Sequence, residues 1–213
     1  GPFATPPAPL DGAGALIGLG LRRLVAGIAA VALARLVWAA SGSRPLATIP
    51  LLAGLSLALH FGLFAIVAGL WRRAGVRCRA LFRAPFLAES LGEFWGRRWN
   101  LAFAELTTVA IFRPLAGRVG RRPALLAAFL CSGVLHELAI SVPVMAGFGL
   151  PTLYFLLHGG LVLAEGELAR RGRPIAGRRG RAWTLAWLLL PLPLLFHPPF
   201  LAGVVWPLLG RGA

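Results

Sequence analysis

His136 is the side chain in this sequence whose position most strongly indicates chemistry, because it lies inside a long apolar segment, residues 123–147. A segment of this length predicts a membrane-spanning helix, and His136 would lie about 20 Å along it. Polar side chains at such a depth are costly, so they usually face an interior cavity and have a function there. Imidazole exchanges a proton near neutral pH, which makes His136 a candidate base. A structural histidine in an interhelical hydrogen bond is an equally weighted alternative.

Two neighbours share the helix face of His136. Ser132 lies four residues before it and Gly133 three residues before it. The Ser132 hydroxyl could bond to the ring, and Gly133 is expected to leave the space that a bulky substrate needs. Glu137 points about 100° away, so we expect it to pair with another helix or with a cytoplasmic arginine.

A second polar group follows in the next apolar segment. The spacing of Tyr154, His158 and Glu165 keeps them on one face of a helix. This pattern predicts a polar seam that faces the protein interior, and helix–helix hydrogen bonding is its more common use. The two remaining histidines, His60 and His197, lack comparable context, and we assign them no role.

The segment 90–100 is rich in tryptophan and arginine. Ser90 and Glu93 have the spacing of a capping box, which predicts a helix that begins at Leu91. Apolar side chains from there to Leu106 share one face. This pattern predicts an amphipathic helix in the cytoplasmic interface of the membrane.

The polar face of this predicted helix carries Glu93, Arg97 and Asn100. Glu93 and Arg97 are four residues apart, in the favourable order for an ion pair. A plain membrane anchor is the simplest interpretation of the segment. Asn100 argues against it, because a neutral amide can orient a substrate where a charge is too costly.

Long apolar segments must position these groups. A mean hydropathy of +0.77 and 58% hydrophobic residues exclude an ordinary soluble domain. We predict an all-α, polytopic transmembrane helical bundle, a single integral membrane domain over residues 1–213 with about five spans plus the interfacial helix. The last span should be kinked or re-entrant, because it contains Pro191, Pro193, Pro198 and Pro199. The predicted spans are residues 12–40, 46–71, 123–147, 150–169 and 182–209.

The charge distribution predicts orientation. All 22 basic residues are arginines, against 7 acidic residues, and they cluster between the apolar segments. Such clustering is typical of cytoplasmic loops rather than of nucleic-acid binding, so residues 72–122 and 170–181 should lie on the cytoplasmic side of a bacterial inner membrane or its equivalent. Cys78 and Cys131 lie far apart and indicate neither a disulfide framework nor a metal site. Because the chain begins with Gly1, we expect a fragment or a processed protein.

Three motifs together resemble the wax synthase branch of the membrane-bound O-acyltransferase superfamily. They are Ser-Leu-Gly-Glu-Phe-Trp-Gly-Arg-Arg-Trp-Asn at 90–100, Ser-Gly-Val-Leu-His-Glu at 132–137, and Phe-Leu-Leu-His-Gly at 155–159 with Glu165 after it. Their order and spacing agree with that branch, and the similar core covers residues 85–167. The sequence departs at Gly92, where a larger residue is common, and in the short hydrophobic part that precedes the first motif.

The resemblance implies transfer of a fatty acyl group from acyl-coenzyme A to a long-chain alcohol, which gives a wax ester. It implies that His136 and Asn100 are the catalytic residues and that acyl-coenzyme A is a co-substrate, with no other cofactor and no metal. A thioester is already activated, so a base for the alcohol suffices, and Asn100 could stabilise the developing charge. The other candidate residues, for substrate binding, are Trp95, Arg97, Arg98, Trp99, Ser132, Gly133, His158 and Glu165.

Several arginines could meet the phosphates of coenzyme A, although most are expected to be topology signals or lipid contacts. These are Arg97, Arg98, Arg113, Arg121 and Arg122.

Other functions stay open at this point. Within the same chemistry, the acceptor could be diacylglycerol or a sterol. A proton-coupled transporter would use His136, His158 and Glu165 as a relay, and a membrane scaffold would use none of them. In every case we expect membrane lipids as partners and no nucleic acid, with the oligomeric state open.

Overall fold

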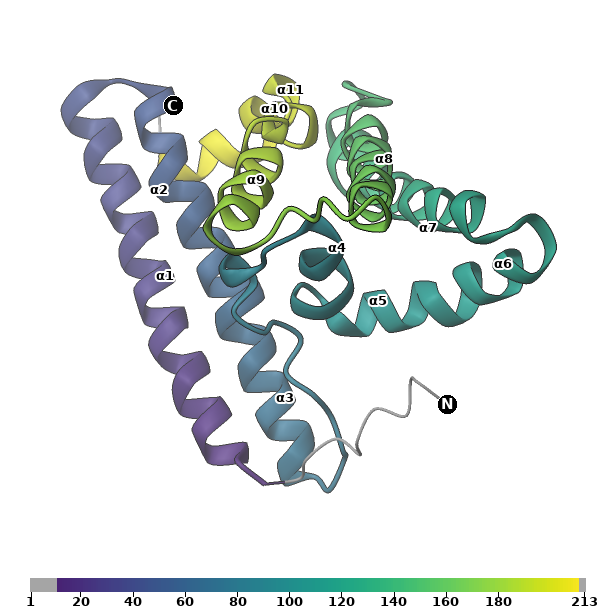
Figure 1. The fold of residues 1–213 in the computed structure, drawn as a ribbon. Helices are drawn as coiled ribbons and strands as arrows, with labels where there is room; N and C mark the ends of the chain where they lie inside the picture. Colours follow the sequence, from purple (N-terminus) through teal and green to yellow (C-terminus); the bar gives the residue numbers. More distant parts are fainter. Residues whose placement is uncertain (1–10, 211–213) are drawn as a thin grey trace. The chain divides into compact units, whose positions relative to one another are not determined.

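A computed structural model describes residues 11–210, and within this range the chain is helical with no β-strand (Figure 1). The predicted all-α class is therefore confirmed. Contacts along the chain define two compact units. Unit 1 comprises Gly1–Phe82 and Val205–Ala213, and unit 2 comprises Arg83–Val204.

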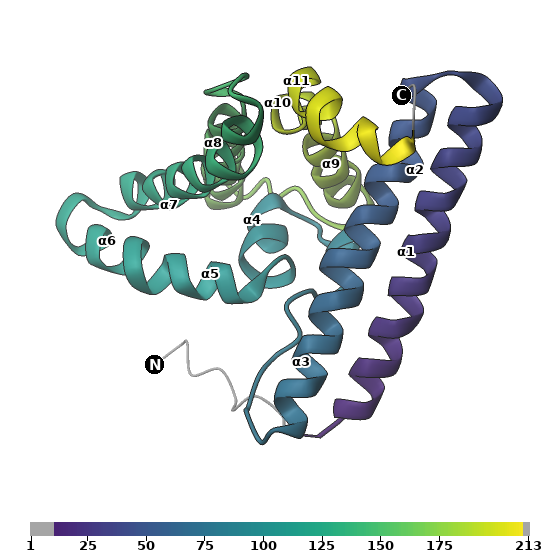
Figure 2. The same cartoon turned by 180° about the vertical axis from the view of Figure 1, so that it is seen from behind.

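Unit 1 is built on two long antiparallel rods, which lie side by side in both views (Figures 1 and 2). The first rod is α1 (Ala13–Ser41), and the second joins α2 (Arg44–Ser56), the π-helix η1 (Leu57–Leu63) and α3 (Phe64–Arg73). After α3 the chain continues to Phe82 without a further helix.

The backbones of the two rods pack closely against each other. A Cβ atom added to Gly27 would lie 2.6 Å from the backbone nitrogen of Ala58, so only glycine fits there. Buried Gly20 and Ala34 lie seven residues on either side of Gly27, on the same face of α1. Small residues at this spacing let two helices pack closely inside a membrane, where no hydrophobic effect drives them together.

Unit 2 contains many shorter elements. Their bounds are η2 (Pro85–Leu87), α4 (Leu91–Glu93), η3 (Phe94–Arg98), α5 (Leu101–Thr107), η4 (Thr108–Phe112), α6 (Arg113–Val119), α7 (Arg121–His136), η5 (Glu137–Ser141), η6 (Val142–Val144), α8 (Leu150–Arg170), α9 (Gly177–Leu189), α10 (Leu192–Leu195) and α11 (Pro198–Phe200). The chain then passes through η7 (Leu201–Val205) to η8 (Trp206–Leu209). The stretch from α5 to α6 turns back at Gly120 into α7, and α7 packs beside α8.

Three helices are long and apolar enough to cross a membrane: Ala13–Ser41, Arg44–Arg73 and Arg121–Val144. A fourth candidate is the pair Gly177–Leu195 and Pro198–Leu209, which is bent by 70°. The bend agrees with the prediction from its prolines. Residues 150–169 do form a helix, α8, but polar side chains such as Glu165 lower its hydropathy. Four of the five predicted spans thus have a candidate helix.

The predicted amphipathic helix is not continuous, which corrects the expectation for residues 91–106. Trp99 adopts an extended conformation, and Asn100 has a φ of 41°, in the left-handed region. The helix from Leu91 therefore ends at Arg98, and a new helix begins at Leu101. The interfacial position of this segment remains a prediction.

Candidate functional site

The tryptophan-rich motif begins with a cap, as its sequence predicts. The Ser90 Oγ accepts a hydrogen bond from the Glu93 N–H at 3.0 Å, and α4 begins at Leu91. The Glu93 carboxylate accepts from the Glu89 N–H at 2.8 Å, one residue before the position that a capping box requires. The Ser90 hydroxyl and the Glu93 carboxylate thus accept hydrogen bonds from backbone N–H groups near the start of α4.

A π-helical turn then changes the partner of Glu93. The Trp99 N–H donates to the Phe94 carbonyl, five residues earlier, at 2.9 Å. This wider turn places Arg98, rather than Arg97, beside Glu93, with the Arg98 Nε and Glu93 Oε1 2.7 Å apart. The predicted Glu93–Arg97 pair is therefore wrong. The Glu89 N–H and the Arg98 guanidinium together hold the pKa of Glu93 below its ordinary value, against the effect of burial.

The Arg98 guanidinium makes several hydrogen bonds within unit 2. It also donates to the carbonyls of Arg83 and Ala84, at 3.2 Å each. Arg98 therefore stabilises the loop before the motif, and its assignment as a substrate contact stays a prediction. Arg97 is exposed, and among residues 11–210 it has no hydrogen bond or ion pair. It is the arginine of the motif that remains open to a ligand.

The two tryptophans of the motif have different contacts. The Trp95 ring lies 5.5 Å from the rings of both Phe155 and His158 on α8, measured between centroids. The Trp99 ring stacks on Phe94 at 5.3 Å, within the motif itself. Trp95 therefore connects the motif to α8, whereas Trp99 shapes the motif.

Asn100 begins the next helix. Its Oδ1 accepts a hydrogen bond from the Phe103 N–H at 3.4 Å, which caps α5. The side-chain amide nitrogen is not used in that cap. In the described part of the chain, no hydrogen bond joins Asn100 to His136, so the structure does not bring the two predicted catalytic residues into contact.

His136 is the last residue of α7, directly before the π-helix η5. Its Nδ1 lies 2.7 Å from the Ser132 carbonyl oxygen. A carbonyl can only accept, so Nδ1 carries the proton and Nε2 keeps its lone pair. The predicted contact with Ser132 thus exists, but through the backbone rather than the hydroxyl. The imidazole is half-buried and lies 4.3 Å from the Phe155 ring.

The residues beside His136 fasten α7 to α8. A Cβ atom on Gly133 would lie 2.7 Å from the Cα of Thr152, so α8 fills the space that the sequence assigned to a substrate. Gly133 is therefore a packing residue, which corrects that expectation. Glu137 Oε1 accepts from the backbone N–H groups of Gly149 and Thr152, at 2.9 and 3.0 Å, and from the Thr152 hydroxyl. Its predicted pairing with another helix is confirmed.

His158 repeats the arrangement of His136 in a fully buried setting. Its Nδ1 lies 2.8 Å from the Tyr154 carbonyl, which again leaves Nε2 as the acceptor. The His158 side chain is 0% exposed, and within residues 11–210 neither its Nε2 nor the neighbouring Trp95 Nε1 has a hydrogen-bond partner. Because His136 is reachable from outside and His158 is not, His136 is the better placed of the two to meet a substrate.

Glu165 holds the motif in place. Its carboxylate accepts from the Leu91 and Gly92 N–H groups at 2.8 and 3.0 Å, and from the Trp183 Nε1 at 2.9 Å. A carboxylate at a helix start is stabilised by the free N–H groups there. These bonds give Glu165 a structural role, and its assignment to substrate binding stays a prediction.

Sequence reasoning missed two positions whose side chains hold elements of the fold together. His197 is 0% exposed, with its Nδ1 accepting from the Phe200 N–H at 3.3 Å and its Nε2 3.3 Å from the Ser141 Oγ. It therefore links α11 to the end of η5, the segment that follows His136. The signal was its place directly before Pro198, a helix N-cap position.

The second missed position is Glu89. Its carboxylate accepts from the Gly177 N–H at 2.8 Å and from Arg181 at 3.1 Å, so it caps α9. No pattern near Glu89 in the sequence indicated a partner 88 residues away. Residues 11–210 contain no group of three or more His, Cys, Asp or Glu side chains that could hold a metal ion.

Family comparisons agree with the motifs at this site. Residues 78–157 match the model of the membrane bound O-acyl transferase family. A probable long-chain-alcohol O-fatty-acyltransferase 3 of Arabidopsis thaliana is 30% identical over 57% of this chain and 40% of its own length. The long-chain-alcohol O-fatty-acyltransferase of Simmondsia chinensis is 34% identical over 37% of this chain and 25% of its own length.

A sterol enzyme is also similar. The acyl-CoA–sterol O-acyltransferase 1 of Arabidopsis thaliana is 32% identical over 38% of this chain and 26% of its own length. The chain thus spans well under half the length of these relatives. Residues 78–157, which contain the tryptophan-rich motif and His136, are thus similar to the membrane bound O-acyl transferase family, and the similar relatives include proteins named for acyl transfer to long-chain alcohols.

Proposed function

We propose that this protein transfers a fatty acyl group from acyl-coenzyme A to a long-chain alcohol, with His136 as the general base. The observation that carries the proposal is the state of the imidazole. The Ser132 carbonyl fixes the proton on Nδ1, so Nε2 of this half-buried ring keeps its lone pair. A histidine held in this tautomer is ready to accept a proton from an alcohol.

The chemistry needs no covalent enzyme intermediate. As the alcohol oxygen attacks the thioester carbonyl, its proton passes to Nε2 of His136, and the C–S bond then breaks. The departing thiolate of coenzyme A takes up a proton. General-base assistance of this kind contributes about 10²- to 10⁴-fold in rate.

Asn100 and Arg97 have supporting roles in the proposal. The amide nitrogen of Asn100 is not used in its helix cap and can donate to the thioester oxygen as negative charge develops there. Arg97 is exposed and has no hydrogen bond or ion pair with another residue of the range 11–210, so it is suited to a phosphate of coenzyme A.

The acceptor follows from the relatives rather than from the geometry. Relatives named for long-chain alcohols support a linear alcohol, and one named for sterols supports a sterol as the second candidate. The membrane supplies either one, whereas acyl-coenzyme A is expected to arrive from the arginine-rich side.

The test is an ester assay in membranes that contain the protein. Labelled acyl-coenzyme A is supplied with hexadecanol, a sterol or diacylglycerol, and each ester is quantified. We expect wax ester from hexadecanol with the native chain and none with His136→Ala. Val134→Ala on the same helix is the matched control, because Val134 is exposed and lies outside the site. No ester from any acceptor with the native chain would contradict the proposal.

A further inference from the structure

A cavity of about 80 Å³ lies within unit 1, and its lining includes no residue of the site around His136. It is bounded by α1, by the second rod and by residues 80–82. Its lining is apolar except for two side chains, Arg23 of α1 and His60 of η1. A π-helix such as η1 is an unusual element that often marks a functional position.

Arg23 has no internal counter-ion. Asp11 is the single acidic residue in the sequence of unit 1, and among residues 11–210 no ion pair involves Arg23. Its guanidinium lies 5.8 Å from the centroid of the Phe61 ring, a cation–π contact. Placing a half-buried guanidinium on a membrane helix without an anion costs free energy, so we expect Arg23 to bind a negatively charged ligand.

The position of Arg23 along α1 matches the depth of lipid phosphates. The eighteen residues that follow it, 24–41, would span about 27 Å, close to the thickness of the hydrocarbon core. The first turns of α1 pack beside the end of α3, where Gly69 lies against Ala13. That end of α3 carries Arg72 and Arg73, which predicts the cytoplasmic face, where anionic lipids are concentrated.

We propose that this cavity binds the phosphate headgroup of an anionic phospholipid. Arg23 donates to the phosphate oxygens from α1, and His60 faces the same cavity from η1. The acyl chains lie along the apolar surface of α1, where Val25 and Ile28 are exposed. This site is independent of acyl transfer, so either proposal can fail without the other.

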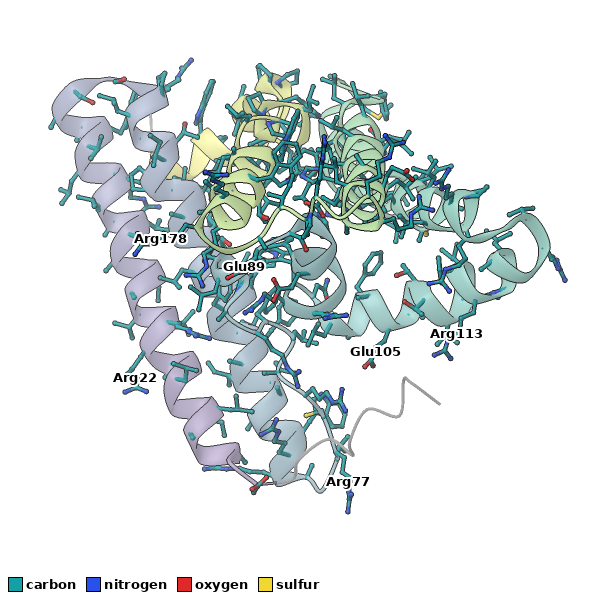
Figure 3. All side chains as sticks on the ribbon, in the orientation of Figure 1. Arg22, Arg77, Glu89, Glu105, Arg113 and Arg178 are labelled. Atoms are coloured by element: carbon teal, nitrogen blue, oxygen red, sulfur yellow. The ribbon has the colours of Figure 1, made fainter. Side chains whose placement is uncertain are left out.

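The chain offers a matched control in the neighbouring residue. Arg22 has the same charge and the same helix, but it is exposed and does not line the cavity (Figure 3). The protein is purified in detergent with phosphatidylglycerol or with phosphatidylcholine of the same chains, and retained lipid is counted by native mass spectrometry. We expect the native chain and Arg22→Gln to retain phosphatidylglycerol, and Arg23→Gln to retain about tenfold less.

Three results would overturn the proposal. The native chain could retain both lipids equally, Arg22→Gln could lose as much as Arg23→Gln, or inorganic phosphate alone could displace the lipid, which would indicate a free-phosphate site. Arg23→Lys guards against misfolding, because it keeps the charge and loses the two-pronged geometry. Arg23→Lys should retain an intermediate amount of phosphatidylglycerol. If Arg23→Gln loses its helical signal, the retention measured for Arg23→Lys and His60→Leu tests the proposal instead.

Discussion

Unit 1 and unit 2 hold their helices together by different means. In unit 1, long rods meet backbone to backbone at glycines such as Gly27, and one acidic residue is present in the whole unit. In unit 2, short helices are interrupted by π-helical turns, and carboxylates join elements far apart in the sequence. Glu89, Glu137 and Glu165 each accept hydrogen bonds from the N-terminus of a different helix.

This difference distinguishes unit 1, whose helices pack by shape, from unit 2, which contains the candidate site. Regular apolar helices need only shape to pack in a membrane, and small residues provide it. A reactive group needs one fixed orientation, and directed hydrogen bonds provide that. His136 accordingly ends α7 where Glu137 ties the chain to α8, and the tryptophan-rich motif is tied to α8 by Glu165.

The largest expected effect is on the glycine contacts of unit 1. Gly27→Val should lower the free energy of unfolding by about 3 kcal/mol, because its side chain would collide with the backbone of Ala58. Gly18→Val on the same helix is the control, since nothing lies within 4 Å of its Cβ position. Unfolding in a detergent titration measures both. Equal losses for the two variants would show that close packing at Gly27 does not hold the rods together.

The carboxylate contacts of unit 2 come next. Glu165→Ala removes the acceptor of three hydrogen bonds and should cost about 2 kcal/mol of unfolding free energy. Glu105→Ala is the control, because Glu105 is exposed and points away from α5 (Figure 3). Protease resistance of the loop before Leu91 should fall in Glu165→Ala alone. An unchanged loop would mean that Glu165 does not hold the motif.

Substitution of the two arginines of the motif should affect stability in one case and substrate binding in the other. Arg98→Gln should lower the unfolding free energy by about 1 to 2 kcal/mol, because two backbone carbonyls and Glu93 lose a donor. Arg97→Gln should leave stability within about 0.5 kcal/mol and raise the KM for acyl-coenzyme A. Thermal unfolding and the ester assay read the two effects. A stability loss at Arg97 and none at Arg98 would reverse the assignment.

The smallest effect is a pH dependence from Glu93. Its folded-state pKa lies below the ordinary value of 4.5, so the stability it contributes is complete above that value. The contribution is lost as the pH falls from 4.5 through the lowered pKa. Glu93→Gln should therefore unfold with a weaker pH dependence in this acidic range. Identical pH profiles for the variant and the native chain would show that Glu93 does not contribute to this pH dependence.

The sequence predicts the regular parts of the molecule better than the broken ones. Apolar length located four candidate spans, and the prolines of the last one indicated its bend. Periodicity assumed one continuous helix after Leu91 and therefore paired Glu93 with the wrong arginine. A π-helical turn leaves no clear mark in residue types, so this error had no local signal.

The roles of the polar residues were predictable only where the partner was local. Ser132 lies one helical turn before His136, and its contact was foreseen, although the backbone makes it. Glu165 and Glu89 bond to segments 74 and 88 residues away, and only the fold brings those segments together. For the same reason, Gly133 was assigned to a substrate instead of to the neighbouring helix.

The central claim is that Nε2 of His136 accepts the proton of the alcohol. The most direct measurement is the single-turnover rate of wax ester formation by His136→Ala with and without added imidazole. We predict a rate about 10²- to 10⁴-fold below that of the native chain, partly restored by imidazole, which supplies the missing base. A His136→Ala protein that forms ester at the native rate without imidazole would contradict the account.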